Sequence, residues 1–185
     1  MRLETPRLLL RPWHADDAAD LYEYASDERV GPIAGWPPHT SVEHSAQIIR
    51  SVFSHPEVYA LQLKDNQRAV GCVGILIGAN SNFEISEQEG EIAYWIGVPY
   101  WGQGLVPEAV REVMRHGFET LKLKALWCGY FANNSQSYTA QSKCGFRHHH
   151  TEENKYNPFL QDYRTEHISC ITYPQWLQQH PPAGR

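Results

Sequence analysis

The sequence predicts a single α/β domain, built as an α+β mixed sheet that is mostly antiparallel and has helices on both faces. The hydrophobic period changes repeatedly along the chain between two, which is typical of strands, and about 3.6, which is typical of helices. The resulting order is β-α-α-β-β-β-α-β-α-β-β. A length of 185 residues, with 42% hydrophobic and 20% charged residues, is ordinary for one globular domain. We expect this domain over 1–180 and a disordered tail over 181–185.

The N-terminal third is predicted to contain one strand and two helices. Pro12 follows a short apolar stretch and would end a strand. Apolar residues then recur at helical spacing, while three prolines and Trp36 between residues 31 and 39 indicate a loop. Thr40 followed by Glu43 resembles a capping box, which opens helices. The expected elements are a strand over 8–11, a helix over 15–25, the loop over 31–39 and a helix from Thr40 through Val52.

The rest of the chain is predicted to alternate strands with helices. Alternating and β-branched stretches predict the central strands, and a polar stretch between two of them predicts a hairpin loop. After Gly104 the apolar residues recur with the helical period. The expected elements are strands over 58–63 and 70–77, a hairpin loop over 80–90, a strand over 91–98, a helix over 106–121, a strand over 125–131, a helix over 135–143, last strands at Phe146 and over 162–172, and a terminal helical turn from Pro174.

Composition excludes several classes of function. The net charge of −5 argues against direct binding of nucleic acid, which needs a basic surface. The four cysteines show no C-x-x-C spacing, so we expect reduced thiols and neither a disulfide framework nor a zinc site. No stretch approaches the roughly 20 apolar residues that cross a bilayer, and the Met1 end lacks the apolar run of a signal peptide. We expect a cytoplasmic protein with no membrane partner.

The most informative stretch is a predicted strand that runs through Gly102-Gln103-Gly104 directly into an amphipathic helix. Such a turn points backbone N–H groups at one spot, and the helix dipole adds about half a positive charge there. A pyrophosphate fits this site, although a tight turn without a ligand is the alternative. Pro107 stands where a dinucleotide fingerprint would have its third glycine, and no Gly-Lys-Ser/Thr follows, so neither a Rossmann nor a P-loop site is expected.

A second motif carries a family resemblance. Asn134-Ser135-Gln136-Ser137 and Lys143-Cys144-Gly145-Phe146 follow the strand expected over 125–131. Together with residues 4–11, 91–95 and 100–109, these blocks resemble the GNAT superfamily of N-acetyltransferases, within its ribosomal-protein N-terminal acetyltransferase-like (Rim-type) branch. The resemblance runs from about Leu3 to Trp176. It implies a GNAT fold with a splayed strand pair at the centre of the sheet.

The resemblance also implies acetyl-coenzyme A as co-substrate, with no metal. The glycine turn would hold the pyrophosphate, the free edge of the 94–98 strand would pair with the pantetheine, and a backbone N–H there would polarise the thioester carbonyl. Asn134 would bind the pantetheine arm, and Ser137 would lie near the sulfur. Val106, Pro107 and Thr139 depart from the usual pattern, which implies a weaker site. The implied coenzyme-binding residues are Ile96, Gly97, Val98, Trp101, Gly102, Gln103, Gly104, Leu105, Val106, Asn134 and Ser137.

Acetyl transfer requires a neutral amine, so a base must accept its proton before direct attack in a ternary complex. We predict Glu91 as the base with Glu89 in reserve, although a solvated hairpin carboxylate is the alternative for both. We predict Ser137 as the acid that protonates the leaving sulfur, or Tyr138 beside it; a helix-capping hydroxyl is the alternative for Ser137.

The acceptor is predicted to be the N-terminal α-amine of a ribosomal or similar protein. An α-amine with a pKa of about 8 costs ~1.4 kcal/mol to deprotonate at pH 7, against ~4.6 kcal/mol for a lysine near 10.4. Trp36, Tyr94 and Tyr156 are the predicted acceptor-binding residues, with core packing the alternative for Tyr94 and a hydrophobic lid the alternative for the other two. The protein would act as a monomer or homodimer.

Three other functions stay open. The acceptor could be a small amine such as a polyamine, an amino acid or an aminoglycoside, or the chain could be a non-catalytic acyl-coenzyme A-binding module. His148-His149-His150 suggests a metal-binding regulatory protein. Consecutive strand residues point to opposite faces, however, so the three imidazoles converge on one ion only at a bulge, and a polar strand start or loop is favoured.

Overall fold

The computed structural model describes residues 1–181, and its centre is an eight-stranded sheet in the order β1-β2-β3-β4-β5-β6-β8-β7. Every neighbouring pair is antiparallel except β5 with β6, which confirms the predicted mixed and mostly antiparallel sheet. Apart from Pro181, the predicted tail lies outside the described residues. The strands are β1 (Leu3–Glu4), β2 (Leu8–Arg11), β3 (Val58–Leu63), β4 (Ala69–Ile77), β5 (Glu89–Ile96), β6 (Ala125–Phe131), β7 (Arg147–Asn157) and β8 (Asp162–Thr172).

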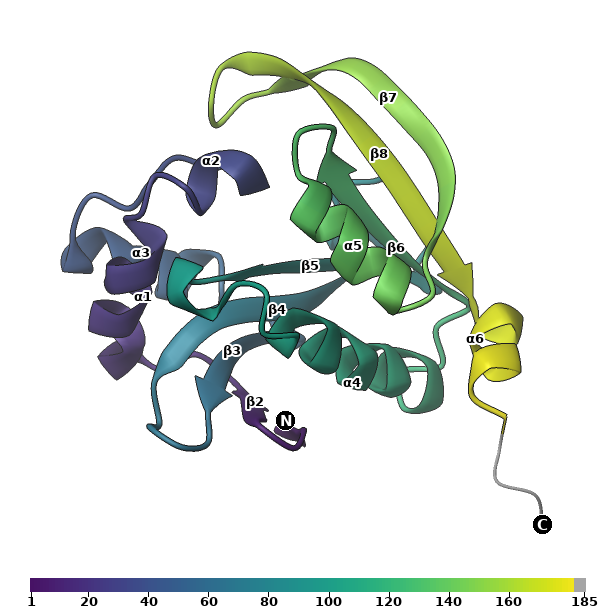
Figure 1. Ribbon diagram of the computed structural model, residues 1–185, viewed down its shortest axis with the longest axis horizontal. Coiled ribbons are helices and arrows are strands. Elements are labelled where there is room, and N and C mark those ends of the chain that lie inside the picture. Colours follow the sequence, from purple (N-terminus) through teal and green to yellow (C-terminus); the bar gives the residue numbers. More distant parts are fainter. Residues whose placement is uncertain (182–185) are drawn as a thin grey trace.

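Helices cover both faces of this sheet, as predicted. In Figure 1, α4 and α5 lie in front of the sheet, while α1, α2 and α3 gather at its left end. The larger core cluster joins α4 to the sheet, and a second one joins α1 and α3 to β3 and β4. The helices are α1 (Ala18–Ala25), α2 (Gly31–Ala34), α3 (Val42–Ser51), α4 (Leu105–Glu119), α5 (Ser135–Lys143) and α6 (Tyr173–Gln179), with 3-10 turns at Ala15–Asp17, Gly78–Asn80 and Val98–Tyr100.

The parallel strands β5 and β6 separate along their length. Their pairing covers only Glu89–Glu91 against Ala125–Trp127, although β5 continues to Ile96 and β6 to Phe131. This opening between the two strands, beyond Glu91 and Trp127, is the splayed pair that the family resemblance implies. Below we call it the splay.

The structure corrects the sequence prediction in four places. The predicted loop over 31–39 contains the short helix α2, which ends at Gly35 in a left-handed conformation (φ 97°). The cap of α3 is Ser41, not Thr40, because the Ser41 hydroxyl accepts the His44 N–H. The strand predicted over 91–98 spans 89–96. The strand predicted only at Phe146 is the 11-residue β7, whose side chains are mostly exposed and therefore show no alternation.

β7 and β8 form a long hairpin, called the arm here, which curves away from the sheet in Figure 1. Two hydrogen bonds join it to the α2 segment: Asn157 Nδ2 donates to Gly35 O (2.9 Å), and Arg164 Nη1 donates to Pro32 O (2.5 Å). The guanidinium of Arg164 also lies 5.0 Å from the Phe131 ring centroid. The arm thus closes over the end of β6 and places α2 beside the splay.

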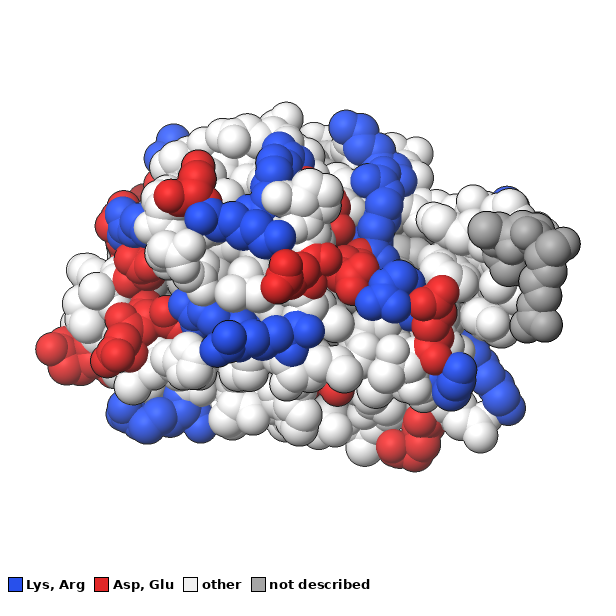
Figure 2. Space-filling model, turned by 90° about the horizontal axis from the view of Figure 1, so that it is seen from below, with Lys and Arg blue, Asp and Glu red and all other residues white. Residues whose placement is uncertain are grey.

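Charged groups are mixed over the surface. Figure 2 shows acidic and basic side chains interspersed over the face seen from below. None of the helices in residues 1–181 is long and apolar enough to span a membrane. The predictions of no nucleic-acid partner and a cytoplasmic location stay predictions.

A buried ion pair joins Arg11, at the end of β2, to Asp17 in the following 3-10 turn. Arg11 Nη1 and Nη2 each donate to a separate oxygen of Asp17 at 2.7 Å, and both side chains are about 10% exposed. Burial on its own would raise the pKa of Asp17, but the hydrogen bonds from Arg11 hold it below its ordinary value of 3.8. The ion pair therefore stabilises the fold above about pH 4, and this contribution is lost as the pH falls through the folded-state pKa.

Replacing Asp17 by alanine should lower the free energy of unfolding by about 3 kcal/mol at pH 7, because it leaves the Arg11 charge buried without a partner. Urea denaturation followed by tryptophan fluorescence measures the change. Asp16→Ala is the matched control, since Asp16 is an exposed carboxylate in the same turn. Equal losses in the two variants would contradict the assignment.

Candidate active site

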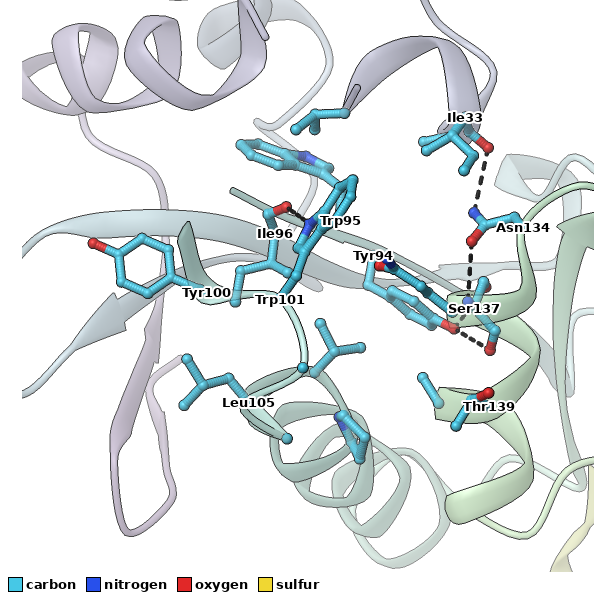
Figure 3. Close-up of a pocket in the computed structure, with 18 of the residues that line it drawn as sticks. Ile33, Tyr94, Trp95, Ile96, Tyr100, Trp101, Leu105, Asn134, Ser137 and Thr139 are labelled. Atoms are coloured by element: carbon cyan, nitrogen blue, oxygen red, sulfur yellow. Dashed lines mark hydrogen bonds between the residues drawn. The ribbon is translucent and has the colours of Figure 1, made fainter. Parts of the chain in front are cut away.

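A cleft of about 300 Å³ lies between the N-terminus of α4, the first turns of α5 and helix α2, with the end of β5 as its floor. Figure 3 shows that its labelled side chains come from these separate elements and converge on the space beside the splay. Its lining consists of Val30, Ile33, Ala34, Tyr94, Trp95, Ile96, Tyr100, Trp101, Gly102, Gly104, Leu105, Val106, Pro107, Asn134, Gln136, Ser137, Thr139, Ala140 and Lys143.

The glycine turn predicted as an anion site lies at one end of the cleft. Gly102 (φ 73°) and Gly104 (φ 76°) are both left-handed, and a Cβ on Gly102 would have no heavy atom within 4 Å. The N–H of Glu108 is bonded to Gly104 O (3.2 Å), which leaves the N–H groups of Leu105 and Val106 at the open helix end. Pro107 sits in this first turn, where its missing N–H breaks no helical bond. Open space and free donors fit a pyrophosphate.

The N-terminal segment holds this turn in place. Arg7 Nη1 donates to Gln103 O (3.0 Å), and Arg7 Nε donates to Glu108 Oε2 (2.7 Å). The hydroxyl of Thr5 donates to Glu108 Oε1 (2.5 Å). Burial would raise the pKa of Glu108, but the hydrogen bonds from Thr5 and Arg7 hold it below its ordinary value. The early block of the family resemblance therefore braces the anion turn.

Lys143 supplies a cation at the same end of the cleft. It is exposed at the end of α5, and its backbone carbonyl accepts Arg111 Nη2 of α4 (2.8 Å). The next residue, Cys144, has its Sγ 3.6 Å from Pro107 O. Lys143 thus stands beside the α4 N-terminus and provides positive charge in a region where Thr139 contributes none.

Replacing Lys143 by glutamine should weaken acetyl-coenzyme A binding about tenfold, because a charge-assisted hydrogen bond contributes roughly 1.5 kcal/mol. Isothermal titration at two salt concentrations measures this, and the salt dependence should fall with the affinity. Lys124→Gln, at another exposed lysine, is the control. Unchanged affinity at low salt would remove Lys143 from the site.

Two hydroxyls meet in the deep part of the cleft. Tyr94 Oη lies 2.9 Å from Ser137 Oγ, and Asn134, the N-cap of α5, accepts the Ser137 N–H through Oδ1 (3.0 Å). Asn134 Nδ2 donates to Ile33 O (3.3 Å), which joins α5 to α2 (Figure 3). Burial raises the pKa of Tyr94 well above its ordinary value, so its hydroxyl keeps its proton at neutral pH. The pair forms a proton-donating group facing the cleft.

The end of β5 is partly committed to bonds within the protein. Gly97 N–H donates to Val70 O (2.8 Å), and Trp101 Nε1 donates to Ile96 O (2.8 Å). The Gly97 N–H is therefore not free to polarise a thioester. Because backbone groups alternate in direction along a strand, those of Ile96 point into the splay instead.

The cleft brings together most of the predicted coenzyme residues. Gly97, Val98 and Gln103 are not among its lining; Gln103 Nε2 donates to Pro99 O (2.8 Å) from an exposed position. The predicted residues in the lining are Ile96, Trp101, Gly102, Gly104, Leu105, Val106, Asn134 and Ser137.

The predicted acceptor residues are spread more widely. Tyr94 lines the cleft, where it also packs against the core. Trp36 is not among the lining residues; its ring centroid lies 5.8 Å from that of Trp95, a lining residue, in a T-shaped contact. Tyr156 is half exposed near the tip of the arm, 5.2 Å from the Tyr163 ring. Their roles in acceptor binding stay predictions.

The carboxylates predicted as bases lie at the closed end of the splay, outside the cleft lining. Glu91 is buried, and its carboxylate accepts hydrogen bonds from Ser81 Oγ (2.8 Å) and from the backbone and amide N–H groups of Asn82. Glu89 accepts Trp127 Nε1 (3.2 Å) and Ser86. Tyr138, the alternative acid, is 55% exposed and packs on Tyr130 outside the lining.

The three consecutive histidines lie on β7 at a register shift between His148 and His150. His149 Nδ1 lies 2.8 Å from His150 Nδ1, and the His149 ring packs against Trp127. In the described part of the chain, no group of three or more histidine, cysteine or acidic side chains could hold a metal ion. The bulge therefore brings two of the imidazoles together, but not all three.

Sequence reasoning missed the residues that α2 brings to the cleft and the polar face of α5. Ile33 and Ala34 lie in the loop predicted over 31–39, and Val30 lies just before it, so none of the three carried a signal. Gln136, Thr139, Ala140 and Lys143 are spaced at i, i+3, i+4 and i+7, so the helical period alone would have placed them on one face with the predicted site.

Comparison with known proteins identifies a family to which the chain is similar. The acetyltransferase (GNAT) domain model matches residues 7–147. YoaA, an uncharacterized N-acetyltransferase of Bacillus subtilis (strain 168), is 25% identical over 150 residues, covering 78% of this chain and 82% of that protein. A GNAT-family acetyltransferase structure from Bacillus anthracis has a TM-score of 0.78 at 19% identity, covering 93% of this chain and 98% of the other. The ribosomal-protein-S5-alanine acetyltransferase structure from Vibrio fischeri has a TM-score of 0.72 at 18% identity, over 95% and 98%.

Proposed function

This chain belongs to the GNAT acetyltransferase family, and from that premise we propose that it acetylates the N-terminal α-amine of a protein. The family makes it an acetyl-coenzyme A-dependent N-acetyltransferase with an amine acceptor. The anion turn and Lys143 fit the phosphates of the donor, and the cleft between them and Ser137 fits its pantetheine arm. The nature of the amine is the proposed part.

The observation that supports a protein acceptor is the group of exposed aromatic side chains at the tip of the arm. Phe159 is 70% exposed, Tyr163 71% and Tyr156 50%, and all three lie at or next to the hairpin turn. Exposed aromatic groups in one place are typical of surfaces that contact other proteins. The bonds of Asn157 and Arg164 to the α2 segment place this tip on the α2 side of the splay, so a polypeptide can lie along the arm with its terminus at the opening.

The chain's own residues support direct transfer within a ternary complex. The backbone donors of the glycine turn hold the phosphates, and the free edge of β5 aligns the pantetheine. Ser137, held by Asn134 and hydrogen-bonded to Tyr94, gives its proton to the leaving sulfur. Glu91 as the base remains the sequence prediction, and its carboxylate already has donors from Ser81 and Asn82.

The proposal is tested by release of the coenzyme A thiol from acetyl-coenzyme A. Peptides beginning with Ala or Ser should react faster than a panel of polyamines, amino acids and aminoglycosides, and chemical capping of the peptide N-terminus should stop the release. Mass spectrometry should find the acetyl group on the first residue. Release only with small amines would overturn the protein acceptor and leave the transfer reaction in place. No release with any amine, despite binding of acetyl-coenzyme A, would favour a non-catalytic module.

A further inference from the structure

Glu166 of β8 places a carboxylate over β6, the strand that borders the splay. Gly129 lies on β6 beyond Trp127, the last residue that pairs with β5. A Cβ on Gly129 would collide with the Glu166 carboxylate and with the ring of Phe83. The Glu166 carboxylate therefore occupies the space of the missing side chain, directly over the β6 backbone.

This carboxylate and the Tyr94–Ser137 hydroxyls lie on opposite sides of the sheet. Cys128 belongs to the core under α4, so the next residue, Gly129, faces the other side. From the α5 side, Gln141 Nε2 donates to Gly129 O (3.0 Å) and lies 3.3 Å from Ser137 Oγ. The Gly129 backbone and the Gln141 amide thus lie between Glu166 and Ser137. The two groups stand on opposite sides of β6 where it borders the splay.

One oxygen of this carboxylate is free. Glu166 Oε2 pairs with Lys155 Nζ (2.9 Å), which is also bound by Glu152 (2.7 Å), whereas no residue in 1–181 donates a hydrogen bond to Oε1. On the same face, both oxygens of Glu91 already accept hydrogen bonds from Asn82. Glu166 is therefore the carboxylate with spare capacity for an incoming donor, and an ammonium group is such a donor.

Neighbouring residues make this position suitable for a cation. Ala93 of β5 is exposed on this side of the splay, and its methyl side chain leaves room above the strand. The rings of Phe83 and Phe131 already carry cations, since Lys155 Nζ lies 5.3 Å from the first ring centroid and the Arg164 guanidinium 5.0 Å from the second. The Phe83 ring and the Glu166 carboxylate both lie at the Gly129 Cβ position, so an ammonium bound by Glu166 would also lie near an aromatic ring.

We propose that Glu166 binds the acceptor ammonium and removes its first proton. The neutral amine then forms the N–C bond to the acetyl carbon, and the C–S bond breaks. The second proton of the nitrogen ends on the leaving sulfur through the Ser137 hydroxyl, which gives one proton and regains one. Glu166 returns its proton to water, so the products are the amide, the free thiol and one proton. This assignment rests on the acetyl transfer of the proposed function and holds for either kind of acceptor.

The test compares Glu166→Gln with Glu152→Gln and Glu91→Gln, using whichever peptide or small amine the wild-type protein acetylates. Glu166→Gln should lower kcat/KM for the amine at least about 30-fold at pH 7 and leave the KM for acetyl-coenzyme A within about twofold. Glu152→Gln likewise removes a carboxylate charge that pairs with Lys155, but at a side chain that is 40% exposed. Its kcat/KM for the amine should stay within about threefold of the wild-type value. Thermal melts report whether each variant is folded.

A pH series separates a proton acceptor from a structural residue. The rate of Glu166→Gln should rise about tenfold per pH unit from 7 toward the pKa of the amine, because water then removes the proton instead. The other charged or titratable groups on this side of β7 and β8 are Lys155, Glu152 and His150 of β7 and Arg164 of β8, and Glu166→Gln changes none of them. A loss in Glu166→Gln no greater than in Glu152→Gln, a deficit that does not recover with pH, or a large loss only in Glu91→Gln would overturn the proposal. If the wild-type protein acetylates small amines but not peptides, only the proposed protein acceptor is wrong, and the test of Glu166 proceeds with the small amine.

Discussion

Gly104→Val should weaken acetyl-coenzyme A binding by at least about a thousandfold. The residue has φ 76°, where a β-branched side chain is a strained outlier, and it is the N-cap of α4. Gly104 also lines the cleft at the end that we assign to the phosphates, so a branched side chain there would narrow this space. Isothermal titration with acetyl-coenzyme A measures the loss, and circular dichroism shows whether α4 is retained.

Gly104→Asn separates strain from steric occlusion. Asparagine adopts left-handed backbone with little penalty, so this variant should melt close to the wild type. Its side chain still projects from the turn, and we expect an affinity loss of about a hundredfold. A folded Gly104→Asn protein with wild-type affinity would show that the glycine turn is only a turn, which is the alternative that the sequence left open.

Ser137→Ala should lower kcat by about a thousandfold while acetyl-coenzyme A affinity stays within about threefold. The variant removes the hydroxyl that Tyr94 Oη contacts at 2.9 Å, and with it the proton for the departing thiolate. Tyr94→Phe should lower kcat about tenfold, because Ser137 then loses the partner that orients it. Since the two act as one unit, the double variant should be no slower than Ser137→Ala. Stopped-flow detection of thiol release measures each rate.

Two hydroxyls on the same helix provide controls. Ser135→Ala removes an exposed hydroxyl from the first turn of α5 and should leave kcat unchanged. Tyr138→Phe tests the alternative acid, which lies outside the cleft lining, and should also be silent. A thousandfold loss in Tyr138→Phe with an active Ser137→Ala protein would reverse the assignment.

Much of the donor side of the site could be predicted because its signals are local. Gly102 and Gly104 stand two residues apart before an amphipathic helix, and the backbone geometry they permit is decided within that turn. Asn134 and Ser137 are likewise three residues apart, so the cap of α5 brings them together whatever the rest of the fold does. For the same reason, most predicted strands and helices differ from the structure by only a few residues at their ends.

The acceptor side could not be predicted, because its parts meet only in the folded chain. Helix α2 has four residues, too few to form on their own, and it is anchored by Asn134 of α5 and Arg164 of β8. β7 is polar on both faces, so its strand character comes from pairing with β8 and not from alternation. Glu166 gave no signal at all, since nothing local marks a carboxylate that lies over a glycine of another strand.

The sequence by itself therefore determined the fold class and the family, and it predicted the anion turn, since each depends on the periodicity and spacing of nearby residues. Only the tertiary structure decided which carboxylate stands beside the splay and which hydroxyls lie on the opposite side of the sheet. The register of β6 against β8 sets Glu166 over Gly129, and the separation of β5 from β6 sets Ser137 opposite. The position of Glu166 depends on strand pairing between distant segments, and a one-residue change of register in β8 would turn this side chain to the other face.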